Sequence, residues 1–460
     1  MIVQTKDQVT TLRESQQRFF KDHYRSYQAR EQALLTLKEA IITYEDSIYS
    51  ALRADLGKSD VEILTTEVAF VIQEINETLK HLLHWMQPKR VRGSLLTFPS
   101  SNKIHYEPFG SVLIIAPWNY PFQLLIAPAI GAIAAGNSVV LKPSEFAPKT
   151  AQVIEAMIED FFPESQLAVV QGEIKETTWL LEEPFDYIFF TGSPKVGSIV
   201  MAQAAKHLTP VTLELGGKSP CIVDETAPLQ ATAKRILFGK TVNAGQTCIA
   251  PDYLVVHESI KDKLVDALKV ELTAMYGTHY NQGYGKIIHQ GHYNRLEGLL
   301  EGCKVLISGP RDAKKRSFPL HVVEAPKKNH PIHHEEIFGP ILPIYTYKTK
   351  TDIEHLVSQE ANPLALYIFS QNQAFHDDLA KSIPAGGVCI NDTILHIVNP
   401  YLPFGGRGRS GHGAYHGATS FLTFSHQKSV MTRSFHFDVK QKYPPYSPNI
   451  FNTIKHLLMK

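Results

Sequence analysis

The sequence predicts an α/β fold with two doubly wound α/β domains and a small bridging β segment. Nearly all-apolar runs of strand length alternate with helical segments from Gly110 onwards. Such strands are typical of a parallel sheet covered by helices on both faces. A second alternating region starts near Val211 and continues to about Pro400. The chain of 460 residues is also too long for one compact domain. A protein of this length usually folds into roughly two or three domains.

The N-terminal region from Asp7 to about Trp85 is predicted to be helical. Its apolar residues recur at helical spacing, as in residues 34–42, and Gly57 is its only glycine. The character of the sequence changes between Val91 and Pro108, where serines, prolines and alternating apolar positions appear. This segment is expected to be an extended β excursion.

The first alternating region supplies four expected strands and four expected helices. The strands are residues 111–116, 138–141, 167–170 and 186–190, and the helices are residues 128–135, 150–162, 177–181 and 196–207. Ligands bind at the carboxyl ends of the strands in such sheets. Lys142, Gly172 and Gly192 fall at those ends and are therefore candidate ligand-binding positions.

The second alternating region is expected to form the second α/β domain, over residues 211–419. Its candidate strands are residues 254–257, 305–308, 341–347, 366–369 and 388–391. Two further segments, 86–108 and 420–442, read as β structure outside both domains.

The last segment, 443–460, is expected to be a tail that ends in an amphipathic helix. One face of this helix carries Ile450, Phe451, Ile454, Leu457 and Leu458. Docking against the protein is the favoured interpretation, and a weak membrane-interface contact is the alternative.

Composition excludes several classes of partner. Lys and Arg number 46 and Asp and Glu number 45, and no stretch is basic enough for a nucleic-acid site. The N-terminus does not resemble a signal peptide, and no stretch reaches the roughly 18 to 20 apolar residues of a membrane span. We therefore expect no nucleic-acid partner, no membrane span and a cytoplasmic location.

Cysteine and histidine spacing gives no sign of a metal site. The four cysteines are widely spaced and form no CxxC pair. His330, His333 and His334 cluster, but their spacing is not that of a usual zinc site, and a solvated loop is the better interpretation. We expect no metal.

Three motifs carry chemistry. Cys248 follows a run of small and polar residues in Asn-Ala-Gly-Gln-Thr-Cys. The other three cysteines, Cys221, Cys303 and Cys389, fit unreactive positions in the core. Glu214 precedes a Gly-Gly pair in Thr-Leu-Glu-Leu-Gly-Gly-Lys, and a thiol that attacks a carbonyl needs such a base. Asn119 in Pro-Trp-Asn-Tyr-Pro offers an amide that can donate to a developing oxyanion.

Together these motifs resemble the aldehyde dehydrogenase superfamily, and most closely its shorter class 3 branch, from about Leu12 to about Lys442. The resemblance implies NAD(P)-dependent oxidation of a medium- or long-chain aliphatic, aromatic or terpenoid aldehyde to the acid. It implies that Cys248 forms a thiohemiacetal and then a thioester, and that Glu214 activates the hydrolytic water. Asn119 and the Cys248 backbone N–H would stabilise the oxyanion.

The resemblance also assigns the domains and a nucleotide site. Residues 1–85 and 109–210 become the NAD(P)-binding domain and residues 211–419 the catalytic domain. The turn from Gly192 to Gly197 would hold the pyrophosphate at a helix N-terminus. The implied cofactor contacts are Trp118, Lys142, Glu145, Gly172, Gly192, Ser193, Val196, Gly197, Leu215, Glu336 and Phe338.

The cofactor preference depends on one carboxylate. Lys142 is suited to hydrogen-bond the adenosine ribose, and Glu145 would disfavour an added 2′-phosphate through like charge. NAD is therefore preferred, with NADP as the alternative.

The chain departs from the family pattern after Pro-Phe-Gly-Gly. Arg407 stands where a small or apolar residue is usual, and Arg409 where a small or polar one is usual. These two cations could attract a substrate with a distal carboxylate or an anionic surface, although solvated side chains are the favoured interpretation. His416 matches the family's Tyr-His-Gly turn and is expected to be structural.

Two other functions compete with hydrolytic oxidation. A CoA-acylating aldehyde dehydrogenase usually lacks the base, so Glu214 argues against that alternative. An inactive structural or binding homologue would be free to lose Cys248, Glu214 or Asn119, and all three are present. In the family, β segments such as 86–108 and 420–442 bridge subunits, and the short N-terminus favours a homodimer.

Overall fold

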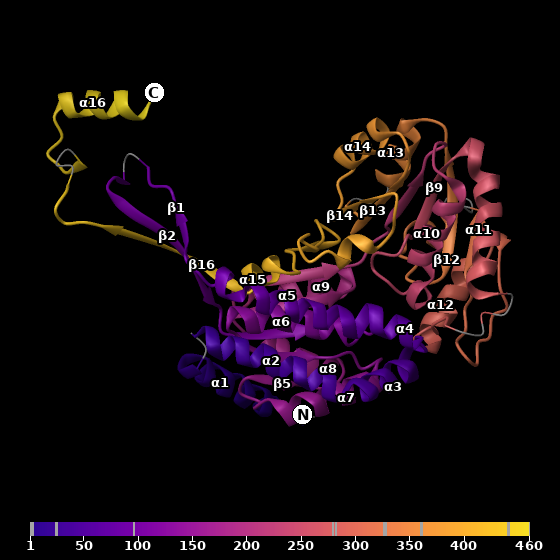
Figure 1. Ribbon diagram of the computed structural model, residues 1–460, viewed down its shortest axis with the longest axis horizontal. Coiled ribbons are helices and arrows are strands. Elements are labelled where there is room, and N and C mark those ends of the chain that lie inside the picture. Colours follow the sequence, from indigo (N-terminus) through magenta and orange to yellow (C-terminus); the bar gives the residue numbers. More distant parts are fainter. Residues whose placement is uncertain are drawn as a thin grey trace.

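The computed structural model describes residues 4–23, 26–94, 97–277, 280, 283–324, 329–358, 362–438 and 442–459. Within these ranges the chain forms two large sheets with helices packed around them, and one small sheet that projects from the rest of the molecule (Figure 1). The expected α/β architecture is confirmed. No helix in these ranges is long and apolar enough to cross a membrane.

The N-terminal region is helical, as predicted. Its elements are α1 (Lys6–His23), α2 (Tyr27–Thr43), α3 (Glu45–Leu56), α4 (Asp60–Ile63), the π-helix η1 (Leu64–Val68) and α5 (Ala69–Trp85). Gly57 ends α3 in the left-handed conformation, which glycine adopts without steric cost. These helices pack with the first large sheet at the bottom of Figure 1.

The first large sheet has the strand order β15-β7-β6-β3-β4-β5. Its strands are β3 (Ser111–Ile115), β4 (Ser138–Lys142), β5 (Leu167–Val169), β6 (Tyr187–Gly192), β7 (Val211–Leu215) and β15 (Gly411–His412). All are parallel except β15, which runs antiparallel to β7. The helices that follow its strands are α6 (Gln123–Ala135), α7 (Pro148–Phe161), α8 (Ile174–Glu182) and α9 (Pro194–Ala205).

One predicted boundary is wrong. We expected the second domain to begin at Val211, but β7 pairs in parallel with β6 and belongs to the first sheet. The backbone of β7 makes its hydrogen bonds with β6 in the first sheet. The chain therefore passes to the second sheet only after β7, at Pro220. Gly411 and His412 also return to the first sheet, from far along the sequence.

The second large sheet has the order β10-β11-β12-β9-β8-β13-β14, with only β10 antiparallel to its neighbour. Its strands are β8 (Pro220–Val223), β9 (Tyr253–His257), β10 (Lys304–Ile307), β11 (His321–Glu324), β12 (Ile341–Tyr347), β13 (Ala365–Phe369) and β14 (Gly387–Ile390). The helices of this region are α10 (Leu229–Thr241), α11 (Lys261–Tyr276), α12 (Gln290–Leu300), α13 (Lys350–Ser358) and α14 (Gln373–Ser382), with short 3₁₀ turns η3 (Val242–Gly245), η4 (Glu258–Ile260), η5 (Pro331–His333) and η6 (Leu395–Val398).

The small sheet confirms β structure outside both large sheets. It consists of β1 (Lys89–Val91), β2 (Ser100–Pro108) and β16 (Ser425–Arg433), all antiparallel. The expected β segment from 420 is wrong at its start, because α15 (Ala418–Thr423) precedes the strand. Ser420 and Phe424 lie against α6 where a Cβ on Gly131 would stand, so close packing fixes this turn as helix.

The C-terminal tail ends in α16 (Pro448–Leu458), as predicted. In Figure 1 this helix lies beyond the small sheet, far from both large sheets. Phe451 is 63% exposed, so the expected docking against the chain's own body is wrong for this residue. The side chains of Leu457 and Leu458 lie outside the described ones.

Candidate active site

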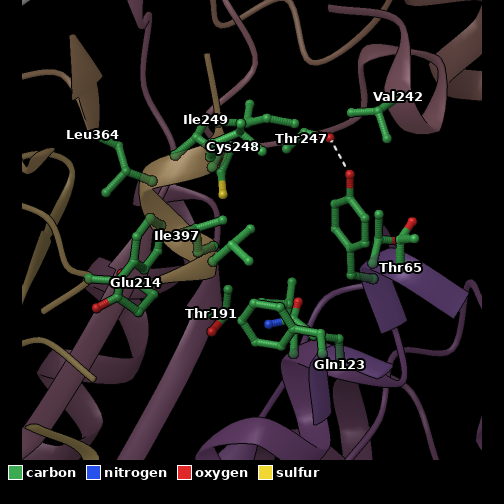
Figure 2. A pocket seen from close by; sticks show the side chains of 18 of the residues that line it. Thr65, Gln123, Thr191, Glu214, Val242, Thr247, Cys248, Ile249, Leu364 and Ile397 are labelled. Atoms are coloured by element: carbon green, nitrogen blue, oxygen red, sulfur yellow. Dashed lines mark hydrogen bonds between the residues drawn. The ribbon is translucent and has the colours of Figure 1, made fainter. Parts of the chain in front are cut away.

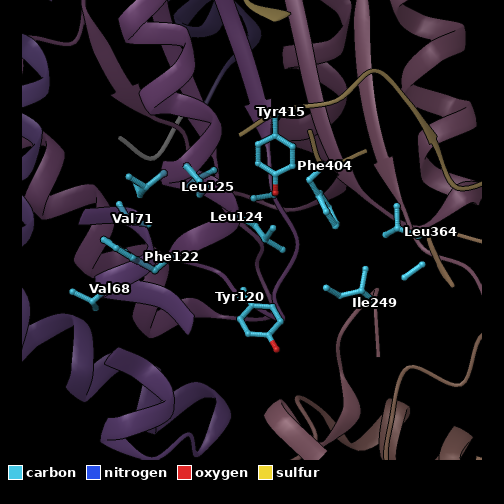
Figure 3. Close-up of a cluster of buried hydrophobic side chains, with 14 of the residues drawn as sticks. Val68, Val71, Tyr120, Phe122, Leu124, Leu125, Ile249, Leu364, Phe404 and Tyr415 are labelled. Carbon is cyan, nitrogen blue, oxygen red and sulfur yellow. The ribbon is translucent and has the colours of Figure 1, made fainter. Parts of the chain in front are cut away.

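Cys248 opens onto a cavity of about 390 Å³ between the two large sheets. The walls are mainly apolar, with an apolar cluster around Val68, Phe122 and Leu125 beside them (Figure 3). The lining residues are Thr65, Thr66, Ala69, Phe70, Gln73, Tyr120, Gln123, Leu124, Thr191, Glu214, Leu215, Phe238, Val242, Thr247, Cys248, Ile249, Leu364, Ile394, Leu395, Ile397, Val398, Phe404 and Tyr415.

The tight turn of η3, which is distorted at Asn243 and Ala244, leads into Cys248 at this cavity. Asn243, Ala244 and Gly245 all have positive φ, and a Cβ on Gly245 would stand 2.6 Å from the backbone of Gly339. Figure 2 shows the Cys248 sulfur pointing into the space that Gln123 and Thr191 border from the other side.

The electrostatic surroundings keep the Cys248 thiol protonated at rest. Burial, followed by the carboxylates of Glu336 and Glu214, raises the pKa of Cys248 to about 12. The backbone N–H groups of Cys248 and Ile249 act in the opposite direction. The thiol therefore needs an added positive charge or a base to become a nucleophile.

Glu214 lies on β7 and lines the same cavity, 3% exposed. Neither of its carboxylate oxygens accepts a hydrogen bond from the described residues. Burial alone raises the pKa of Glu214 well above 4.5, the ordinary value. A buried carboxyl with free lone pairs and a raised pKa is suited to accept a proton from water.

Asn119 is buried in the loop after β3 but is not one of the lining residues. Its side-chain nitrogen donates to the carbonyl of Gln246, at 3.0 Å, two residues before Cys248. A side-chain amide has two N–H donors, so one remains after this bond is made. The structure thus ties Asn119 to the Cys248 loop.

The carboxyl ends of neighbouring strands gather the predicted nucleotide residues. Lys142 ends β4 and Gly192 ends β6, while Leu215 ends β7 and Gly172 follows β5. Lys142 is buried, its Nζ donates to the Pro143 carbonyl at 2.8 Å, and burial lowers its pKa. Glu145, just beyond, is exposed.

The turn between β6 and α9 has no room for larger side chains. A Cβ on Gly192 would stand 2.5 Å from the Phe190 ring, and a Cβ on Gly197, in α9, would stand 2.6 Å from the side chain of Leu215 on β7. Ser193 caps α9 by accepting from the N–H of Val196, whose side chain is 42% exposed. The open backbone here suits a phosphate group.

Glu336, Phe338 and Trp118 come together on the catalytic side. The Glu336 carboxylate sits where a Cβ on Gly216 would stand, and burial raises the pKa of Glu336 to about 8. The rings of Phe338 and Trp118 meet edge to face, with their centroids 5.4 Å apart. The three residues, far apart in sequence, therefore lie in one region.

A model of the aldehyde dehydrogenase family matches residues 3–430. The chain belongs to the aldehyde dehydrogenase family. It is 45% identical to the 4,4'-diaponeurosporen-aldehyde dehydrogenase of Staphylococcus aureus, over 91% of this chain and 92% of the relative. It is 43% identical to the aldehyde dehydrogenase, dimeric NADP-preferring, of Rattus norvegicus, over 95% of this chain and 97% of the relative.

A solved structure supports the same assignment. The substrate-bound state of Staphylococcus aureus AldH superimposes with a TM-score of 0.95 at 42% identity, and the match covers 99% of this chain and all (100%) of that chain. The protein is therefore an oxidoreductase that acts on aldehydes with NAD or NADP, as the resemblance implied.

Several other predicted positions lie away from the aldehyde dehydrogenase cavity. Arg407 and Arg409 are exposed and do not line it, which favours solvated side chains. His416 is buried against the ring of Tyr415, with centroids 4.1 Å apart, as a structural residue would be. The His333 ring bonds the Tyr345 hydroxyl at 2.8 Å.

Sequence reasoning missed several polar residues of the cavity wall. Gln123 and Tyr415 line the cavity, and the buried Thr191 hydroxyl has no hydrogen-bond partner among the described residues. Tyr120 also lines it, and its hydroxyl bonds that of Thr247 at 2.7 Å (Figure 2). No periodicity marks these positions; only the nearness of Tyr120 and Gln123 to Asn119 in sequence hinted at them.

Proposed function

We propose that this aldehyde dehydrogenase converts a medium- or long-chain aliphatic, aromatic or terpenoid aldehyde to its carboxylic acid through a thioester on Cys248. The observation that carries the proposal is the cavity that Cys248 and Glu214 share. Its mainly apolar wall favours apolar substrates, because each buried CH₂ contributes about 0.8 kcal/mol. The Staphylococcus aureus relative is named for an aldehyde, as 4,4'-diaponeurosporen-aldehyde dehydrogenase, which supports an aldehyde substrate.

The first step is addition of the Cys248 sulfur to the aldehyde carbon. The thiol loses its proton to solvent, the sulfur bonds to the carbonyl carbon, and the carbonyl oxygen takes the negative charge of a thiohemiacetal anion. The Asn119 amide and the Cys248 backbone N–H stabilise this oxygen, and loss of one such donor typically costs about 10²–10³ in rate. The raised pKa of Cys248 makes activation of the thiol part of this step.

The second half is hydrolysis of the thioester. Glu214 takes a proton from a water molecule, which attacks the thioester carbon and releases the acid and the thiol. The raised pKa of Glu214 suits this general base, because a more basic carboxylate accepts the proton more readily. A CoA-acylating enzyme would not need this base, so Glu214 favours hydrolysis.

The residues present fit a nicotinamide dinucleotide. Gly192 ends β6 and Ser193 caps α9, so the backbone N–H groups of this helix N-terminus suit a pyrophosphate. Lys142 would hold the adenosine ribose, Glu336 the second ribose, and Phe338 would pack beside the nicotinamide. When bound, the dinucleotide would supply the hydride acceptor for the two-electron oxidation of the thiohemiacetal to the thioester. Glu145 favours NAD over NADP.

We assign the region of the first sheet to cofactor binding and that of the second sheet to catalysis, in a cytoplasmic homodimer. The small sheet projects from both regions, where a second copy could pair with it (Figure 1). The printed name of the Rattus norvegicus relative includes the word dimeric.

The test is NADH appearance at 340 nm with aldehydes from acetaldehyde to hexadecanal, plus benzaldehyde, without CoA. Turnover with kcat/KM rising with chain length supports the proposal. No turnover of any aldehyde, in protein shown to bind NAD, contradicts hydrolytic oxidation and leads to the same panel with CoA added.

A further inference from the structure

A fully buried ion pair lies next to the two loops that carry Asn119 and Cys248. Lys58, just before α4, and Glu67, in η1, have side chains that are 0% exposed, with Nζ and Oε1 2.5 Å apart. Burying two charges is costly, and a buried pair is poor evidence of stabilisation. Its position therefore invites a functional explanation.

The pair holds both ends of the segment from Asn119 to Gln123. The Lys58 Nζ also donates to the Asn119 carbonyl, at 3.0 Å. The second carboxylate oxygen of Glu67 accepts from the Gln123 N–H, at 2.9 Å. The Lys58 ammonium further lies 3.9 Å from the centroid of the Tyr120 ring.

The same neighbourhood also holds the Cys248 loop. Glu62 of α4 accepts from the N–H of Asn243, at 2.7 Å. The Asn243 side chain donates to the Asn119 carbonyl, at 2.7 Å, beside the Lys58 bond. The Asn119 side chain completes this hydrogen-bond network by donating to the Gln246 carbonyl.

The π-helix gives this arrangement its geometry. η1 interrupts the helical run between α4 and α5, and π turns occur frequently at functional sites. Glu67 points inward to Lys58, while its neighbours Thr65 and Thr66 line the cavity. One widened turn thus forms both the cavity wall and the support beneath the Asn119 segment.

We propose that Lys58 and Glu67 are positioning residues for the oxyanion donor. They fix the Asn119 backbone so that its side-chain amide stays bonded to Gln246, with the second N–H left for the aldehyde oxygen at Cys248. This inference rests on the proposed function, because it concerns the same oxyanion.

A double-mutant cycle on kcat tests this inference. The variant K58M/E67Q removes both charges together and leaves neither one buried alone, and N119A removes the donor itself. We expect K58M/E67Q to lower kcat by about 10²-fold, the scale of a 1 Å misplacement, with the Kd for NAD unchanged. In the N119A background the same pair should change the remaining rate little, because the donor it positions is gone.

A control distinguishes positioning from loss of stability. Arg13 and Glu183 form another ion pair, 12% and 7% exposed, between α1 and the end of α8. R13M/E183Q should lower Tm without changing kcat. E67Q keeps an acceptor oxygen and should lower kcat by a smaller factor. In the N119A background E67Q should leave kcat unchanged. This single variant tests the proposal even if K58M/E67Q does not fold.

Each outcome separates the two proposals. Suppose that the unmodified enzyme oxidises aldehydes and that N119A lowers kcat. If E67Q or K58M/E67Q then lowers kcat by the same factor in the N119A background as in the unmodified enzyme, the positioning role is wrong. If the unmodified enzyme oxidises no aldehyde, the proposed function fails first.

Discussion

At the scale of single residues, the site is built from a carboxyl and a thiol whose pKa values burial raises. Glu214 is the clearest case, since its carboxyl accepts no hydrogen bond from the described residues. Such a group costs folding free energy wherever it would ionise in the unfolded chain. The catalytic base should therefore destabilise the fold at neutral pH.

The first residue-scale prediction is that Glu214→Gln stabilises the protein as pH rises. The pKa of Glu214 is raised in the fold above 4.5, the ordinary value that applies when unfolded. Stability is thus lost from about pH 4.5 upwards, by about 1.4 kcal/mol per pH unit, until the folded pKa is reached. The Tm of E214Q minus that of the unmodified protein should be near zero at pH 4.5 and positive at pH 8.

An exposed glutamate provides the matched control. Glu14 of α1, which is exposed, should give a Tm difference without this trend when changed to Gln. A Tm difference for E214Q that is flat or falls with pH would show that burial does not raise the pKa of Glu214.

Residues also show how far sequence reasoning reached. Cys248, Glu214 and Asn119 stand in recognisable motifs, and the fold brings Cys248 and Glu214 to one cavity. Lys58 and Glu67 were not predicted. A buried charge in a helical segment has the same sequence signature as a solvated one, because burial depends on contacts with residues distant in the chain.

At the scale of elements, apolar runs predicted the strands that contain them well, whereas short strands with few apolar residues were missed. β3 and β4 contain four and three consecutive apolar residues, against two in β11, and lie where the sequence indicated. β8 begins with Pro220, and β11 begins and ends with polar residues, so neither was recognised. β15 is two residues long and exists only because β7 offers an edge.

The element-scale prediction concerns η6 at the opening of the cavity. Leu395 and Val398 line the cavity yet are 47% and 50% exposed, as is Phe238 at 47%, which marks the opening between η6 and α10. Val398→Asp should lower kcat/KM for decanal by about tenfold or more. Each CH₂ of the substrate that lies beside the introduced carboxylate would lose part of its burial free energy, which is about 0.8 kcal/mol per CH₂. Propanal, whose chain is seven carbons shorter than that of decanal, should be affected much less.

The control valine lies on α11. Val270 is 62% exposed and does not line the cavity, so Val270→Asp should leave both aldehydes unchanged. Equal losses for propanal and decanal with Val398→Asp would contradict an opening at η6.

At the scale of the whole molecule, the small sheet is the feature that a single chain does not explain. It stands apart from the large sheets and exposes apolar residues, with Met431 of β16 56% exposed (Figure 1). Exposed strand edges favour pairing with another chain. We predict that the enzyme sediments as a dimer at micromolar concentration.

A charge on this sheet should weaken the dimer. Met431→Lys is expected to shift sedimentation towards the monomer, since a buried ammonium would need a partner. Leu208→Lys, at a site 90% exposed outside the sheet, should leave the dimer intact. A monomer for the unmodified protein would contradict the bridging role of the sheet.

The most direct test of the whole account is a single turnover with E214Q. The unmodified enzyme should release acid continuously, whereas E214Q should form one NADH per active site and then stop, because water is no longer activated. Intact mass should then show hexanal less two hydrogens, attached to Cys248. Steady turnover by E214Q, or an adduct on any other residue, would contradict a Cys248 thioester hydrolysed with Glu214 as base.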